Sequence, residues 1–189
     1  MTTEPSTQRT FNRQRIWRVT PRAYDRAVRL LVDAARQLGD VQAVTGIANG
    51  GVTLAHGVAT LLHAAEYQIG ARHNPTNDVY TQATGQVEVD MTTLTTALGG
   101  RRIVGRVLLV DDICGTGATF AATRAALQQF LHPEATVSTL ALCRNEGTSC
   151  DPDLWAWTVD DWVLFPWEPT PSCSTLIEDI PLPNGVNGR

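Results

Sequence analysis

Blocks of apolar residues separated by short polar breaks run through most of the chain, and they predict helices and strands in turn. Thr20 and Pro21 form a helix start, and Gly39 ends that helix. Between them apolar side chains recur at helical spacing, at Val28, Leu31, Val32, Ala35 and Leu38. Residues 41–48 then predict a strand, residues 52–65 an apolar helix and residues 66–71 another strand. This alternation favours an α/β fold with a mainly parallel sheet.

The pattern changes after residue 71. Breakers and polar residues predict a loop over 72–78, and residues 80–84 and 86–90 predict two short paired strands around Gly85. We assign no chemistry to the threonine-rich residues 91–102. Residues 107–110 are continuously apolar, which is typical of a strand buried on both faces. A helix follows over 119–127, continuing to about Leu131, and residues 135–143 predict a further parallel strand.

The turn between the strand at 107–110 and the helix at 119 carries the strongest candidate chemistry. The strand stops at two adjacent carboxylates, Asp111 and Asp112, and a loop with Gly115 and Gly117 follows. The first N–H groups of a helix lack partners and attract anions, and glycine lets the backbone curl around a phosphate. The acids can then accept hydrogen bonds from sugar hydroxyls. The turn therefore suits a sugar phosphate. It is neither a Walker A loop nor a dinucleotide fingerprint, because the chain contains no lysine and the acids precede the glycines.

Residues 107–119 resemble the 5-phosphoribosyl diphosphate (PRPP) signature of type I phosphoribosyltransferases: an apolar strand, two acids, then x-x-x-Thr-Gly-x-Thr. The resemblance covers roughly residues 41–168. It implies a twisted, mainly parallel sheet flanked by helices, with a small C-terminal hood. It also implies that Asp111 and Asp112 are catalytic, holding the ribose hydroxyls and favouring positive charge at the anomeric carbon; the sequence does not rank the two acids. The implied 5′-phosphate site comprises Cys114, Gly115, Thr116, Gly117, Ala118 and Thr119.

A second loop lies where the strand at 41–48 meets the next helix. Gly50 and Gly51 can present bare backbone N–H groups to an anion. The stretch resembles the pyrophosphate loop of the same family, and this resemblance implies pyrophosphate binding by Ala48, Asn49, Gly50 and Gly51. Many relatives carry Arg or Lys at the place of Asn49, so backbone and metal would hold pyrophosphate here. In the family a mobile loop corresponding to residues 72–90 closes over the substrate.

The C-terminal part of the chain is rich in tryptophan. Its run of residues 161–168 resembles the Trp-x-x-x-Pro-Trp-acid ending of bacterial xanthine/guanine/hypoxanthine phosphoribosyltransferases. The resemblance implies that Trp162 stacks on the base, that the Val163 backbone reads its edge, and that Glu168 lies near a metal ion. Arg144 takes the place of a lysine that contacts the 6-oxo group. The alternative is that these tryptophans only cap the core.

The resemblance predicts an enzyme that transfers 5-phosphoribosyl from PRPP to a nucleobase with Mg²⁺ and releases pyrophosphate. The tail favours a 6-oxopurine (hypoxanthine, guanine or xanthine) as acceptor. Gly115 departs from the family pattern, because 6-oxopurine enzymes usually have an aspartate there that exchanges a proton with N7. A transferase for another heterocycle therefore stays open, and so does a regulator that binds PRPP or nucleotides without transfer.

Chain length and composition limit the number of domains, the partners and the cellular location that we expect. At 189 residues with 43% hydrophobic residues, the chain suits one compact domain, which we place at 16–168 between a polar N-terminal arm (1–15) and a proline-rich tail (169–189). The net charge of −4 argues against nucleic acid as a partner, although the arm is arginine-rich. We expect that arm to be dispensable for catalysis. No signal peptide or membrane span is apparent, so we expect a cytoplasmic protein with unpaired cysteines, forming a homo-oligomer (dimer or tetramer).

Overall fold

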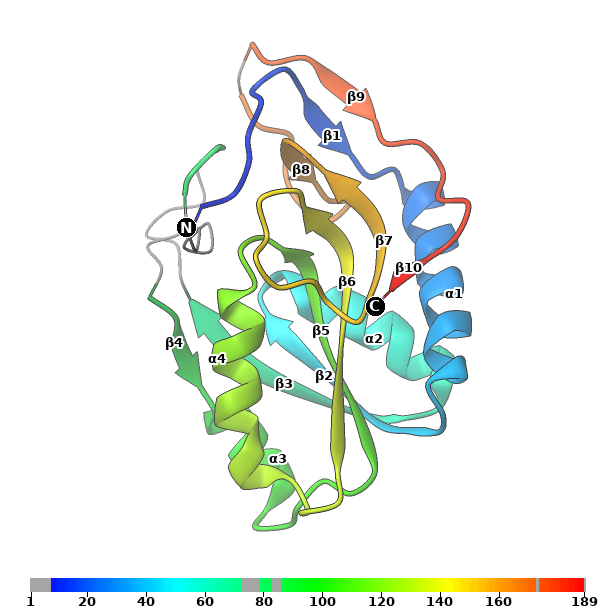
Figure 1. Ribbon diagram of the computed structural model, residues 1–189, viewed down its shortest axis with the longest axis vertical. Helices are drawn as coiled ribbons and strands as arrows, with labels where there is room; N and C mark the ends of the chain where they lie inside the picture. Colours follow the sequence, from blue (N-terminus) through cyan, green and yellow to red (C-terminus); the bar gives the residue numbers. More distant parts are fainter. Residues whose placement is uncertain (1–7, 73–78, 83–85, 173, 189) are drawn as a thin grey trace, which may run out of the picture.

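The computed structural model describes residues 8–72, 79–82, 86–172 and 174–188, and its centre is a seven-stranded sheet (Figure 1). The strand order is β10-β7-β6-β5-β2-β3-β4. The inner strands are parallel to one another, and the edge strands β4 and β10 run antiparallel to their neighbours. The bounds are β2 Val41–Ala48, β3 Ala65–Arg72, β4 Glu88–Asp90, β5 Arg106–Cys114, β6 Thr136–Asn145, β7 Leu154–Val159 and β10 Asn187–Gly188.

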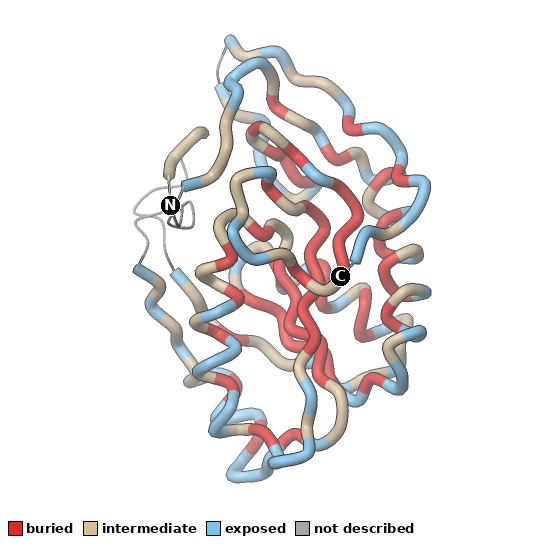
Figure 2. Tube along the Cα trace, in the orientation of Figure 1, coloured by how far each residue is buried: buried red, intermediate tan, exposed pale blue. Residues whose placement is uncertain are grey.

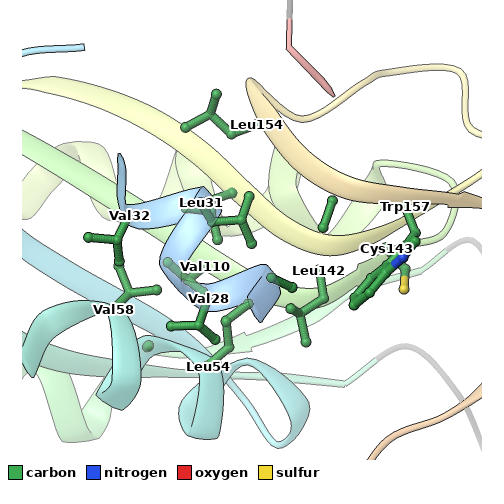
Figure 3. Close-up of a cluster of buried hydrophobic side chains, with 14 of the residues drawn as sticks. Val28, Leu31, Val32, Leu54, Val58, Val110, Leu142, Cys143, Leu154 and Trp157 are labelled. Carbon is green, nitrogen blue, oxygen red and sulfur yellow. The ribbon is translucent and has the colours of Figure 1, made fainter. Parts of the chain in front are cut away.

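Helices cover both faces of this sheet, as expected for parallel strands. Side chains of a strand alternate between the faces, so Leu108 and Val110 of β5 join one buried cluster while Val107 and Leu109 join the other. The first cluster is covered by α1 (Pro21–Gln37) and α2 (Gly50–Leu62) (Figure 3), and the second by α3 (Thr92–Leu98) and α4 (Ala118–Leu127), which continues as a 3₁₀ turn, Gln128–Phe130. Buried residues accordingly follow the central strands (Figure 2).

A smaller sheet of three parallel strands lies beyond the carboxyl ends of the central strands (Figure 1). Its middle strand is β1 (Ile16–Arg18), flanked by β8 (Trp162–Leu164) and β9 (Ile177–Asp179). The expected C-terminal hood is therefore built from both ends of the chain. The segment after Glu168 is part of this body as well, because β9 pairs with β1, Ile180 is buried, and the Pro181 carbonyl accepts a hydrogen bond from Trp157 Nε1 at 2.9 Å.

Five strands, β1 and β7 to β10, have no counterpart among the sequence predictions, and three other elements differ from them. Strand β5 does not stop at the acids but continues through them to Cys114, because its ladder with β6 persists. The threonine-rich stretch forms helix α3, for which we predicted no element. Residues 80–82 are not a strand; β4 pairs with β3 instead, and residues 83–85 lie outside the described residues. Of the predicted loop at 72–78, Arg72 is the last residue of strand β3, and residues 73–78 lie outside the described residues.

Two further sequence expectations concern the membrane and the cysteines. None of the helices in the described part of the chain has the length and apolar character needed to span a membrane. No disulfide joins Cys114, Cys143 or Cys150, while Cys173 lies outside the described residues.

Candidate active site

The two carboxylates near the end of β5 lie at the edge of the sheet where the central parallel strands end. Asp111 is 9% exposed, and its Oδ1 accepts a hydrogen bond from the Asp112 backbone N–H at 3.0 Å. Burial raises the pKa of both carboxyls, that of Asp112 to about 7. The charge of Asp112 adds to the shift of Asp111, and the charge of Glu168 adds to that of Asp112. Arg9 opposes both shifts. The site thus gathers negative charge that a hydrogen-bond donor or a cation would stabilise.

The loop after these acids leads into the N-terminus of α4. Gly117 has φ +90° at the N-cap of α4, and a Cβ there would lie 2.9 Å from Cys150 Cβ, so only glycine fits. The Thr116 hydroxyl accepts a hydrogen bond from the Ala118 N–H at 3.3 Å. The Cys114 thiol lies beside Thr148 and the Cys150 carbonyl, and burial raises its pKa to about 11, although the contact with Thr148 opposes this shift. Cys114 is therefore a neutral thiol at neutral pH and does not repel an anion bound at the backbone of the loop.

The loop after β2 packs directly against the acids. A Cβ on Gly50 would lie 1.7 Å from Asp112 Oδ2, and a Cβ on Gly51 would lie 2.4 Å from the Val110 carbonyl oxygen. The two glycines let the loop approach the end of β5. The peptide bond between Ala48 and Asn49 is cis. Ala48, Asn49 and Gly50 face the same space as Asp111 and Asp112.

The hood contributes an aromatic wall. Trp162 begins β8, and its ring lies 5.9 Å from Phe11 and 6.3 Å from Tyr80, measured between centroids. The next residue, Val163, is buried and also lines the cavity. Glu168 follows, and its Oε2 accepts a hydrogen bond from the Phe165 N–H at 2.9 Å.

A single cavity of about 620 Å³ joins these parts. Most of the residues that we predicted from the sequence line it: Ala48, Asn49, Gly50, Asp111, Asp112, Cys114, Gly115, Thr116, Gly117, Thr119, Trp162, Val163 and Glu168. It lies between the carboxyl ends of β2 and β5 on one side and the hood on the other. Open α/β sheets bind ligands at this edge.

The family model for the phosphoribosyl transferase domain matches residues 20–172. The chain belongs to this family. No match is found among curated protein sequences.

Solved phosphoribosyltransferase structures share the fold. The purine phosphoribosyltransferase of Pyrococcus horikoshii Ot3 superposes with a TM-score of 0.67 at 22% identity, over 83% of this chain and 96% of that one. The xanthine-guanine-hypoxanthine phosphoribosyltransferase of Helicobacter pylori gives a TM-score of 0.63 at 20% identity, over 80% and 92%. A hypothetical protein from Neisseria gonorrhoeae with bound ppGpp gives 0.60 at 21%, over 82% and 90%. At these identities the likeness concerns the fold.

Three predicted site residues of this phosphoribosyltransferase do not line the cavity. Gly51 and Ala118 lie behind it, at the first turns of α2 and α4. Arg144, predicted to contact the base, instead lies at the end of β6, where its Nε donates to Asp151 Oδ1 at 2.5 Å. Its guanidinium also lies 5.9 Å from the Trp155 ring centroid.

Several cavity residues were not predicted from the sequence, among them Arg9, which comes from the segment that we expected to be a loose arm. Residues 9–15 are instead held by hydrogen bonds to the body of the protein. The guanidinium carbon of Arg9 lies 5.5 Å from the Trp162 ring centroid. No local pattern marks this arginine, because its neighbours come from distant parts of the sequence.

Proposed function

We propose that this phosphoribosyltransferase transfers the 5-phosphoribosyl group of PRPP to a nucleobase, with a 6-oxopurine as the favoured acceptor. The observation that carries the proposal is the shared cavity: a carboxylate pair, two glycine-containing loops and an aromatic wall face one another across it. An anion cradle, a ribose site and a stacking surface are the parts that such a transfer needs. The fold neighbours named as purine and xanthine-guanine-hypoxanthine phosphoribosyltransferases support the choice of base.

The proposed roles follow from position. Backbone N–H groups from Cys114 to Thr119, at the N-terminus of α4, would bind the 5′-phosphate. Asp111 and Asp112 would accept hydrogen bonds from the ribose hydroxyls and stabilise positive charge developing at the anomeric carbon. The loop at Ala48–Gly51 would hold the pyrophosphate through its backbone. Trp162 would stack on the base, as aromatic side chains do on nucleobases.

The carboxylates fit a magnesium ion bound together with substrate. The charge of Glu168 reaches Asp112 strongly enough to raise its pKa, so the cavity concentrates negative charge. Among the residues that the structure describes, no group of three or more His, Cys, Asp or Glu could hold a metal ion. Mg²⁺ usually keeps waters and takes phosphate oxygens beside one or two carboxylates, and here Asp112 and Glu168 would supply the latter. Such an ion would make pyrophosphate a better leaving group.

A different heterocycle is the second candidate acceptor, and the surroundings of Gly115 favour it. Position 115 has no side chain to exchange a proton with purine N7, and the aliphatic part of Arg9 fills the space beside it. The site therefore has a cation beside the position where 6-oxopurine enzymes usually have a carboxylate.

Incubating the protein with PRPP, Mg²⁺ and a panel of bases, and detecting nucleotide by mass spectrometry, tests the proposal. We expect the nucleotide of hypoxanthine, guanine or xanthine, with equimolar pyrophosphate. A product from another base only would favour the second candidate. If calorimetry shows PRPP binding but no base yields a nucleotide, the protein is a PRPP-binding regulator and the transferase proposal fails.

The assembly and location belong to the same proposal. We expect a cytoplasmic homo-oligomer, dimer or tetramer, that acts on PRPP and free bases and not on nucleic acid. Light scattering coupled to size exclusion measures the subunit number directly.

A further inference from the structure

Arg9 is a cation in the cavity for which the proposed transfer has no role. Its guanidinium carbon lies 5.1 Å from the Phe11 ring centroid and 5.5 Å from that of Trp162, so it lies against the proposed stacking surface. Its Nε is buried and makes no hydrogen bond to any residue in the described part of the chain. A buried donor without an acceptor costs free energy, which a ligand oxygen would recover.

The backbone around Arg9 is clamped from two sides. Arg9 N–H donates to Gln82 Oε1 at 3.0 Å, and Gln82 Nε2 donates back to the Arg9 carbonyl at 2.8 Å. The next residue forms the same reciprocal pair with Asn145: Thr10 N–H to Oδ1 at 2.7 Å, and Nδ2 to the Thr10 carbonyl at 2.9 Å. Asn145 is fully buried at the end of β6. The clamp holds the Arg9 side chain at the cavity wall before any ligand arrives.

Gly115 makes room for this arginine. A Cβ at position 115 would lie 2.9 Å from Arg9 Cδ and 3.1 Å from Arg9 Cγ. Any larger residue would push the Arg9 stem away from the phosphate loop. Gly115 and Arg9 thus depend on each other: the Arg9 side chain occupies the space that a side chain at position 115 would fill.

The chemistry of guanidinium sets what Arg9 can recognise. Arginine offers only donors and stays charged, so its ligand must present acceptor atoms. The carboxylates Asp111 and Asp112 attract it electrostatically, and burial lowers its pKa without providing a partner for Nε. A heterocycle stacked on Trp162 would lie near the Arg9 donors, because the guanidinium carbon is 5.5 Å from the Trp162 ring centroid. An exocyclic carbonyl or carboxylate would accept hydrogen bonds from them. An exocyclic amino group is itself a donor, so it would leave the guanidinium N–H groups without an acceptor.

We propose that Arg9 is a specificity-determining residue of the acceptor site, which selects heterocycles bearing an exocyclic carbonyl or carboxylate over amino heterocycles. This rests on the proposed function, because it assumes that the acceptor stacks on Trp162.

Hypoxanthine and adenine test the proposal, since they share a ring and differ at one exocyclic group. We expect the wild type to prefer hypoxanthine, and Arg9→Met to lower the hypoxanthine-to-adenine ratio of kcat/KM about 10- to 100-fold, the range for a hydrogen bond to a charged group. Arg9→Lys keeps the charge without the planar fork and should fall between the two. Gly115→Asp places a carboxylate against Arg9. It should also reduce the ratio, because the new carboxylate would occupy the Arg9 donors and displace its side chain.

Arg13→Met is the matched control, because Arg13 belongs to the same segment and its guanidinium carbon lies 5.5 Å from the Tyr80 ring centroid, outside the cavity lining. It should leave the ratio unchanged. A wild-type preference for adenine, or an unchanged ratio in Arg9→Met, would overturn the proposal. So would an Arg9→Met that raises the KM for PRPP equally with both bases, since Arg9 would then serve the PRPP anion.

Calorimetry separates this proposal from the transferase itself. If the wild type makes no nucleotide, the proposed function fails, yet hypoxanthine binding still decides the role of Arg9. Hypoxanthine that binds the wild type about tenfold or more tightly than Arg9→Met supports it. Equal or undetectable binding to the two proteins refutes it.

Discussion

Several residues that line the cavity suit ligand binding at the expense of the stability of the fold. Asp111 and Asp112 lie at the end of a buried strand, where burial makes their charged forms unfavourable. Gly50 and Gly51 bring a second loop into contact with them at the cost of any side chain there. These positions could be predicted from the sequence, because the residues that form each loop are adjacent along the chain.

Asp112→Asn should abolish most PRPP-dependent turnover while stabilising the ligand-free, magnesium-free protein. The folded-state pKa of about 7 exceeds that of an unfolded aspartate, so ionisation destabilises the fold progressively above about pH 4. We expect a gain of at least about 1 kcal/mol at pH 8 that shrinks toward pH 4. Urea denaturation at several pH values measures it. A variant that is less stable at pH 8, or that turns over like the wild type, contradicts the assignment.

Trp162→Ala should raise the KM of the base far more than that of PRPP, because the phosphate loop follows a different strand. Stacking is worth about 1–3 kcal/mol per base, so about 5- to 150-fold is expected, with Trp162→Phe milder. Trp157 is the control: it packs in the core and donates to Pro181, so Trp157→Phe should change stability and not the KM ratio. Equal changes in both KM values after Trp162→Ala would remove the stacking role.

At the scale of elements, the apolar blocks predicted helices α1, α2 and α4 and strands β2, β3, β5 and β6, and the exceptions have physical causes. Helix α3 was missed because threonine favours helix weakly; burial of Leu94 and Leu98 and the αL cap at Gly99 hold it. Strand β5 continues past the acids because its partner β6 continues. The N-terminal segment is polar, as a loose arm would be, but the buried Asp161 holds it in place. Its carboxylate accepts hydrogen bonds from three successive backbone N–H groups, those of Arg13, Gln14 and Arg15.

Asp161→Ala should release the N-terminal segment and thereby the Arg9 side chain. We expect faster proteolytic cleavage within residues 9–15 and a raised KM for the acceptor, with PRPP binding retained. Asp160→Ala is the neighbouring control, since the Asp160 carboxylate accepts hydrogen bonds from the side chains of Asn12 and Trp17 and not from the backbone N–H groups of residues 13–15. Its effect on both measurements should be smaller. Deletion of residues 1–15 should raise the acceptor KM further, against the sequence expectation of a dispensable arm. Unchanged cleavage and KM in Asp161→Ala would show that other contacts hold the segment.

At the scale of the whole molecule, the fold class followed from alternating strands and helices together with the PRPP motif. The participation of both chain ends in one hood did not, because pairing between β1, β8 and β9 joins residues distant in sequence and leaves no local signal. Polar and proline-rich composition indicated tails at both ends. In the structure the C-terminal segment instead pairs with β1 of the small sheet and with β7 of the central sheet.

Removing residues 174–189 should therefore destabilise the protein, although these residues lie outside the cavity. The deletion takes away strand β9, buried Ile180, and the carbonyls of Pro181 and Pro183 that accept hydrogen bonds from Trp157 and Arg26. Because the deletion removes one buried isoleucine and these hydrogen bonds, we expect the free energy of unfolding, measured in urea, to fall by at least about 3 kcal/mol. Removing only residues 187–189, which takes away β10, should cost about 1 kcal/mol or less, because both residues of that strand are exposed. Equal denaturation midpoints for the full chain and the longer truncation would show that the hood folds without its third strand.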